Sequence, residues 1–142
     1  MTLIARIDTH SLFHIDLTWF ENNGRNLREE MHVVLCKECR ARFPAPEDAG
    51  IVDRIHPHTA EVMRVDALWE ALADHCGLLP DFITPTTPLT TAVFRALLAN
   101  GNQPMSPEQI RKRINKSNAA AILKLLMGGE IENGLVPFEN KN

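Results

Sequence analysis

Apolar positions near the C-terminus recur with helical spacing and predict two short helices in succession. On the first helix Ile110 and Ile114 fall one above the other, and the three residues between them are basic and face solvent. Ser106 can cap this helix, Pro107 suits its first position, and Gln109 can complete a capping box. These signals fix the start of the helix from local chemistry alone.

The second helix follows a break at Asn115-Lys116, and either Ser117 or Asn118 can cap it. The helix ends at the glycine pair 128–129. Its apolar stripe has i, i+3, i+4 spacing and consists of Ile122, Leu125 and Leu126. Next, Asn133-Gly134 suits a type I′ turn, in which both central residues need positive φ, so we expect a β-hairpin over residues 130–138.

The order of helix, tight turn, helix and hairpin resembles the winged helix-turn-helix superfamily. The resemblance covers about the last third of the chain, and residues 92–99 supply the first helix that such a domain needs. It implies a winged-helix domain at residues 89–142 in which the helix at 118–127 is the recognition helix. A resemblance of this kind specifies a shape and leaves the activity open.

The N-terminal part shows weaker patterns. Alternating positions predict strands at Thr2–Asp8 and Phe13–Leu17, and helical spacing predicts helices over residues 26–35 and about 60–75. Prolines and threonines at 80–88 predict a stiff linker. We therefore expect an α+β protein with a zinc-binding domain at residues 1–79, a linker at 80–88 and the winged helix at 89–142.

Cys36-x-x-Cys39 is the sharpest chemical signal, because two thiolates at this spacing can bind one tetrahedral zinc ion. The segment from Leu35 to Arg40 resembles the second half of a treble-clef zinc finger, although the usual second cysteine pair is missing. We expect Cys76 as the third ligand. The alternative for Cys76 is a buried core thiol, since it lies on the apolar stripe of its own predicted helix.

A histidine would complete the zinc site, and the sequence leaves three candidates open, which are His56, His58 and His75. Each of them could instead be an ordinary solvated residue. A redox role for the cysteine pair is less favoured, because a predicted helix precedes it where a thioredoxin-like motif has a strand.

Charge is unevenly distributed along the chain. Residues 1–89 carry eight Lys/Arg and fourteen Asp/Glu, whereas residues 90–142 carry seven Lys/Arg and four Asp/Glu. The basic excess therefore lies in the winged-helix part, which has the sign expected for a contact with double-stranded DNA. An apolar contact with another protein is the alternative use of the same helices.

If this part binds DNA, the expected contacts lie on the two predicted helices. Arg111, Lys112, Arg113 and Lys116 would hold phosphates, and Asn118, Ala121 and Lys124 would face the groove. The sequence has no phosphate-binding glycine loop, nucleophile elbow or His-Glu-x-x-His motif, so we expect no enzyme and no small-molecule substrate.

No apolar run approaches the length of a membrane span, and the N-terminus lacks a secretory signal pattern. We therefore expect a cytoplasmic, DNA-binding transcriptional regulator, homodimeric and zinc-containing. A non-catalytic adaptor that uses its winged helix for protein contacts is the second hypothesis.

Overall fold

The structure is a computed structural model that describes residues 6–56, 58–129 and 131–139, and it has the predicted α+β class. The N-terminal elements are β1 (Phe13–Ile15), α1 (Leu17–Asn22), α2 (Leu27–Val33), α3 (Lys37–Arg42), the 3-10 turn η1 (Pro46–Asp48), β2 (Ile51–Ile55) and β3 (Val62–Asp66). They are followed by α4 (Ala67–Asp74), η2 (Cys76–Leu78), α5 (Leu89–Ala99), α6 (Pro107–Ile114), α7 (Ala119–Met127) and β4 (Leu135–Pro137). None of the described helices is long and apolar enough to cross a membrane.

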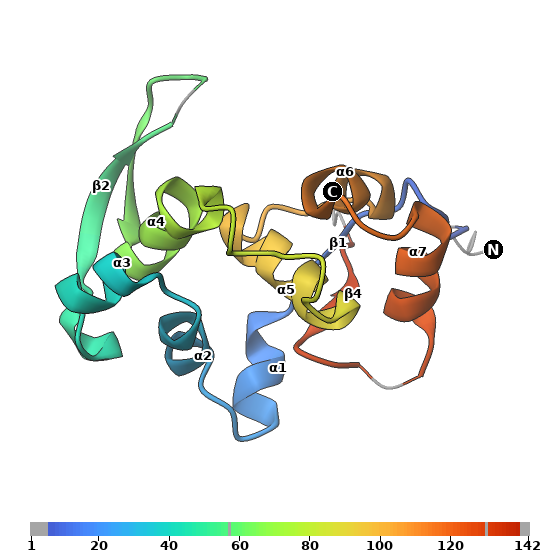
Figure 1. Cartoon of the computed structure of the whole chain (residues 1–142), viewed down its shortest axis with the longest axis horizontal. Helices are drawn as coiled ribbons and strands as arrows, with labels where there is room; N and C mark the ends of the chain where they lie inside the picture. Colours follow the sequence, from blue (N-terminus) through green and yellow to red (C-terminus); the bar gives the residue numbers. More distant parts are fainter. Residues whose placement is uncertain (1–5, 57, 130, 140–142) are drawn as a thin grey trace.

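Two small antiparallel sheets lie in different parts of the molecule (Figure 1). The β2–β3 ribbon projects beside α4, whereas β1 and β4 lie near α6 and α7. In the second sheet Phe13 is opposite Pro137 and Ile15 is opposite Leu135. Phe13 also exchanges backbone hydrogen bonds with Met105, at 2.8 and 2.9 Å, so the chain just before α6 lies along β1.

The helices near the C-terminus form where local capping predicts them. Ser106 Oγ accepts from the Gln109 N–H at 3.2 Å, and the Gln109 side chain accepts from the Ser106 N–H at 2.9 Å. Asn118 caps α7 by accepting from the Ala121 N–H at 2.8 Å. The earlier helix, α5, begins at Leu89 rather than at residue 92.

The predicted hairpin over residues 130–138 is wrong within the described residues. Asn133 and Gly134 do form a tight turn, with φ of 55° and 70°. However, β4 pairs with β1, and residues 131 and 132 form no strand. The Asp16 N–H donates to the Gly134 carbonyl at 2.7 Å, so this turn is fixed against the N-terminal segment and not against a preceding strand.

The predicted helix at residues 60–75 is wrong in its first half. Residues Val62–Asp66 form β3, which pairs with β2, and the helix begins only at Ala67. Asp66 marks the change because its carboxylate accepts from the Leu68 N–H at 2.9 Å and caps α4. The apolar residues of the strand segment happen to match helical spacing. In the structure the valines of this segment, Val62 and Val65, are opposite residues of β2.

The two predicted N-terminal strands have different outcomes. Residues 2–5 lie outside the described residues, and residues 6–8 form no strand. The second strand ends at Ile15, because the Asp16 carboxylate accepts from the Thr18 N–H at 3.1 Å and starts α1. Asn26 caps α2 as predicted, by accepting from the Glu29 N–H at 3.2 Å.

One apolar core includes residues on both sides of the 80–88 segment. Leu68 and Leu72 of α4 belong to it, as do Leu97 of α5, Ile110 of α6 and Ile122 of α7, all completely buried. Within the segment Phe82 is buried in the same core. The apolar core is therefore continuous across residues 80–88. The division of the chain into two domains at this segment stays a prediction.

Candidate metal centre

Four side chains from two distant segments meet in one cluster. Cys36 is the residue before α3 and Cys39 lies within that helix, whereas His75 follows α4 and Cys76 begins η2. Their ligand atoms all lie within 4.8 Å of one another. The structure thus joins the predicted cysteine pair to the predicted third cysteine and to one of the three candidate histidines.

The spacing of these atoms fits a single tetrahedral ion. Bond lengths of about 2.3 Å to sulfur and about 2.05 Å to nitrogen put two sulfur ligands about 3.8 Å apart and a sulfur and a nitrogen about 3.6 Å apart. His75 Nδ1 lies 3.4 Å from the Cys36 Sγ and 3.6 Å from the Cys39 Sγ, and the sulfurs of Cys36 and Cys76 are 3.4 Å apart. These three distances lie within about 0.4 Å of the tetrahedral values.

The cluster is buried on one side and open on the other. Cys39 and Cys76 are buried, Cys36 is partly exposed, and 39% of the His75 side chain is exposed. Glu38 Oε2 lies 3.2 Å from His75 Nε2, on the ring edge away from the sulfurs. A carboxylate there favours the tautomer with the proton on Nε2, which leaves the Nδ1 lone pair directed at the cluster.

Burial and hydrogen bonding separate the acidities of the three thiols. Burial raises the pKa of Cys36, but hydrogen bonds from the Cys39 backbone N–H and from the other cluster side chains outweigh it and bring the pKa to about 7. Burial, followed by the hydrogen bonds with Cys76 and Cys36, raises the pKa of Cys39 to about 12. Burial also raises the pKa of Cys76. Three adjacent thiolates repel one another unless a cation lies between them, and a soft divalent metal ion suits this donor set.

Gly77 allows the second ligand pair to approach α5 closely. A Cβ on Gly77 would lie 2.4 Å from the Leu72 carbonyl oxygen and 2.6 Å from the Ala99 Cβ. The Gly77 carbonyl also accepts a hydrogen bond from Arg113 of α6. The turn that carries Cys76 is therefore packed against α5 and bonded to α6.

The other two candidate histidines, His56 and His58, are not brought to this cluster. They lie in the connection between β2 and β3, and the four-residue cluster includes neither of them. His56 Nδ1 instead accepts from the backbone N–H groups of His58 and Thr59, at 3.2 and 3.3 Å. Its role in the described structure is to stabilise that turn.

Sequence reasoning missed Glu38 and the close approach at Gly77. Glu38 lies inside the cysteine motif, so the sequence could have suggested it as a hydrogen-bond partner of a ligand. Its pairing with His75 depends on how α3 and α4 are arranged, and no local signal shows that arrangement.

Three of the cations expected to contact DNA are engaged within the chain. Arg111 forms an ion pair with Glu108 at 2.7 Å, and Arg113 donates to the Gly77 carbonyl. Lys116 donates to the carbonyl oxygens of Pro85, at 3.1 Å, and of Thr87. These contacts give each of the three side chains a partner within the chain.

The other expected contacts differ in how accessible they are. Lys112 and Lys124 are exposed, and neither forms an ion pair within the described part of the chain. Asn118 is exposed, but its side-chain oxygen is occupied by the cap of α7, and Ala121 is partly buried. Fewer cations on the two helices are therefore free of intramolecular contacts than their composition indicates.

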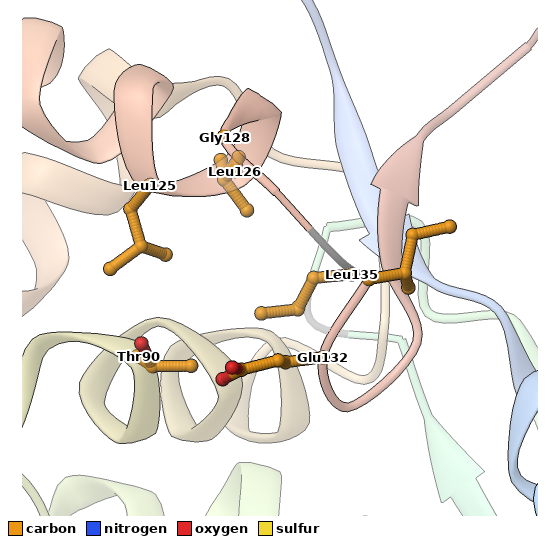
Figure 2. A pocket seen from close by; sticks show the side chains of 7 residues that line it. Thr90, Leu125, Leu126, Gly128, Glu132 and Leu135 are labelled. Carbon is orange, nitrogen blue, oxygen red and sulfur yellow. The ribbon is translucent and has the colours of Figure 1, made fainter.

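A cavity of about 240 Å³ lies between α5, α7 and the segment that leads to β4 (Figure 2). It is lined by Thr90, Leu125, Leu126, Gly128, Ile131, Glu132 and Leu135. Glu132 is the one ionisable group among these lining residues, so the cavity holds no acid–base pair. Four of the lining residues are aliphatic, and Thr90 and Glu132 add a hydroxyl and a carboxylate.

Comparisons with known proteins give no family for this chain, so the functional proposal depends on the geometry of the site. Neither the family models, nor the curated proteins, nor the solved structures include a match to this chain.

Proposed function

We propose that the chain is a non-catalytic protein that binds one structural zinc ion through Cys36, Cys39, His75 and Cys76. The observation that carries the proposal is the convergence of four ligand atoms within 4.8 Å. Three sulfurs and one nitrogen form a donor set typical of structural zinc, and four protein ligands leave no position for a substrate or a reactive water. Glu38 would orient the histidine ligand.

Elemental analysis of protein purified without chelator tests the proposal. We expect about one zinc per chain, and we expect His75→Asn and Cys36→Ser to lose the metal and to melt at a lower temperature. His58→Asn is the matched control, because His58 lies outside the cluster and should keep the metal. A metal-free wild-type protein that is fully folded, or a full zinc content in His75→Asn, would contradict the site.

For the partner, we propose double-stranded DNA, bound by α6 and α7 as in a winged helix-turn-helix. Support comes from two helices joined by the short turn at residues 115–118, from the exposed start of α7 and from the exposed cations Lys112 and Lys124. With only these two cations free, log K should fall with log salt at a slope of about −2, since each neutralised phosphate contributes about −0.9. Two phosphate contacts per chain give only weak binding. Regulation of transcription would therefore need the homodimer, in which two chains bind the duplex together.

Fluorescence anisotropy with a duplex at several salt concentrations measures this slope. Lys112→Ala should reduce it by about one, whereas Lys37→Ala on α3 should leave it unchanged. Asn118→Ala is a poor test of base reading, because removing the helix cap costs about 1 kcal/mol of stability by itself. Failure of the wild type to bind duplex at low salt would refute the DNA proposal and leave the zinc proposal intact.

An adaptor function is the second candidate, and one observation favours it. Ile131 lines the cavity described above, Met127 lies between two of its lining residues in the sequence, and both side chains are exposed. An apolar contact with a partner protein at this position should be nearly insensitive to salt. The salt dependence of the binding affinity therefore distinguishes the two functions: it should be clear for DNA and nearly absent for an apolar protein contact.

A further inference from the structure

The β2–β3 ribbon has an inner face that is attached to α4. Arg54 of β2 donates to both carboxylate oxygens of Asp74, at 2.7 and 2.8 Å. Met63 and Val65 of β3 line an open cavity of about 690 Å³ together with Trp69 of α4. The ribbon is therefore held on one side by an ion pair and by apolar contacts.

The outer ribbon face points away from α4. We define it as the exposed residues of the two strands, namely Ile51, Asp53 and Ile55 of β2 with Val62 and Arg64 of β3. Directly opposite residues of an antiparallel pair share a face, and here Asp53 is opposite Arg64 and Ile55 is opposite Val62. Ile51, Ile55 and Val62 are 58%, 67% and 61% exposed. Clustered exposed aliphatic residues of this kind mark contact surfaces.

We propose that the outer ribbon face forms a symmetric homodimer in which the ribbons of two copies stack face to face. The charges of Asp53 and Arg64 indicate that the partner on this face is a second copy of the chain. Asp53 and Arg64 are exposed, and neither forms an ion pair within the described residues. A twofold axis along the ribbon places β2 of one copy over β3 of the other.

In that arrangement every residue in the middle and at the tip of the outer ribbon face meets a suitable partner. Asp53 meets Arg64 of the second copy, and Ile55 meets its Val62, each twice by symmetry. A two-stranded ribbon is marginal alone, so covering its exposed face with a second ribbon also stabilises it. The face is electrically neutral and aliphatic, which disfavours nucleic acid as its occupant.

Sedimentation velocity over a range of protein concentrations tests the proposal with charge reversals. Asp53→Arg alone and Arg64→Asp alone should each weaken self-association at least about tenfold, because like charges then meet twice. The double variant Asp53→Arg/Arg64→Asp should dimerise again. A mixture of the two single variants should form a heterodimer, since all the meeting charges are then opposite.

Two lysine substitutions test the apolar part of the interface. Val62→Lys should prevent dimerisation, and Val33→Lys is the matched control, because Val33 is 68% exposed at the end of α2 and lies outside the ribbon. Circular dichroism establishes that each variant is folded. A wild type that stays monomeric, or single reversals that fail to pair when mixed, would overturn the stacked-ribbon dimer.

Discussion

Replacing Gly77 by alanine tests whether the turn that carries Cys76 is packed as closely against α5 as the structure shows. The added Cβ would lie 2.4 Å from the backbone carbonyl oxygen of Leu72 and 2.6 Å from the Ala99 side chain. Both distances are far below van der Waals contact, and neither obstacle is a flexible side chain. Relief therefore requires the turn to move away from both the end of α4, which carries Leu72, and α5, which carries Ala99.

The size of the effect follows from the cost of overpacking, which is typically about 1–3 kcal/mol. We expect the upper end of this range, because the closest obstacle is backbone. For 142 residues the unfolding entropy near the melting point is about 0.3 kcal/mol/K, so a loss of about 3 kcal/mol lowers Tm by about 10 °C. The displaced turn should also weaken zinc binding, since Cys76 moves with it.

Thermal unfolding and zinc competition with a chromophoric chelator measure the two effects. Gly50→Ala is the matched control, because nothing lies within 4 Å of a Cβ at that position and its φ is not positive. This control should melt at the wild-type temperature or slightly above it, since alanine restricts the unfolded chain. Equal melting temperatures for Gly77→Ala and Gly50→Ala would refute the close approach.

Three further predictions concern the metal centre and the N-terminal strand. Glu38→Gln should lower zinc affinity about tenfold in a chelator competition, because the histidine ligand loses its carboxylate partner, and an unchanged affinity would contradict that role. Asn102→Gly should lower the free energy of unfolding in urea by about 1–3 kcal/mol. The Asn102 side chain accepts from the Ile15 N–H at 2.8 Å and donates to the Ile15 carbonyl at 2.9 Å, and both bonds are lost. Glycine is the chosen substitute because it tolerates the φ of 58° at this position. After zinc removal, mass spectrometry should find Cys36 alkylated before the other two cysteines, since it is partly exposed, they are buried, and its pKa is about 7.

The helices that were predicted well are those whose ends are fixed by neighbouring residues. Both bonds of the capping box at Ser106 are present, and Asn118 caps the next helix. Such contacts span three residues, so the sequence contains them whole. Asp16 is a counterexample: it lies within the predicted strand Phe13–Leu17, yet it caps α1, and an aspartate before a helix is a common cap.

The strands were predicted less well because their partners are distant. β4 pairs with β1, which lies near the other end of the chain, and no local signal specifies that pairing. The turn at Asn133-Gly134 was predicted correctly in its backbone conformation, yet the turn alone does not decide which strand follows or precedes it. The β2–β3 ribbon was missed because Val65 and Leu68 happened to match helical spacing.

The metal centre shows a similar division. Cys36 and Cys39 followed from their spacing, which is a local property. Cys76 and His75 were among the candidates, but the choice of His75 over the two ribbon histidines depends on where α4 ends relative to α3. Residue type limited the candidate ligands to three cysteines and three histidines. The three-dimensional arrangement of α3 and α4 is needed to identify His75 as the histidine in the cluster.

The metal centre and the ribbon are linked through the chain itself. The ligand pairs come from segments separated by 36 residues, and the chain between them contains the whole β2–β3 ribbon. An ion that closes a loop of this length removes about 3–4 kcal/mol of chain entropy from the unfolded state. Chelation should therefore loosen the base of the ribbon as well as the ligands, and it should weaken the stacked-ribbon dimer. Sedimentation velocity with and without chelator measures this coupling, and a dimer of unchanged affinity in zinc-free protein would show that the ribbon is held by its contacts with α4 alone.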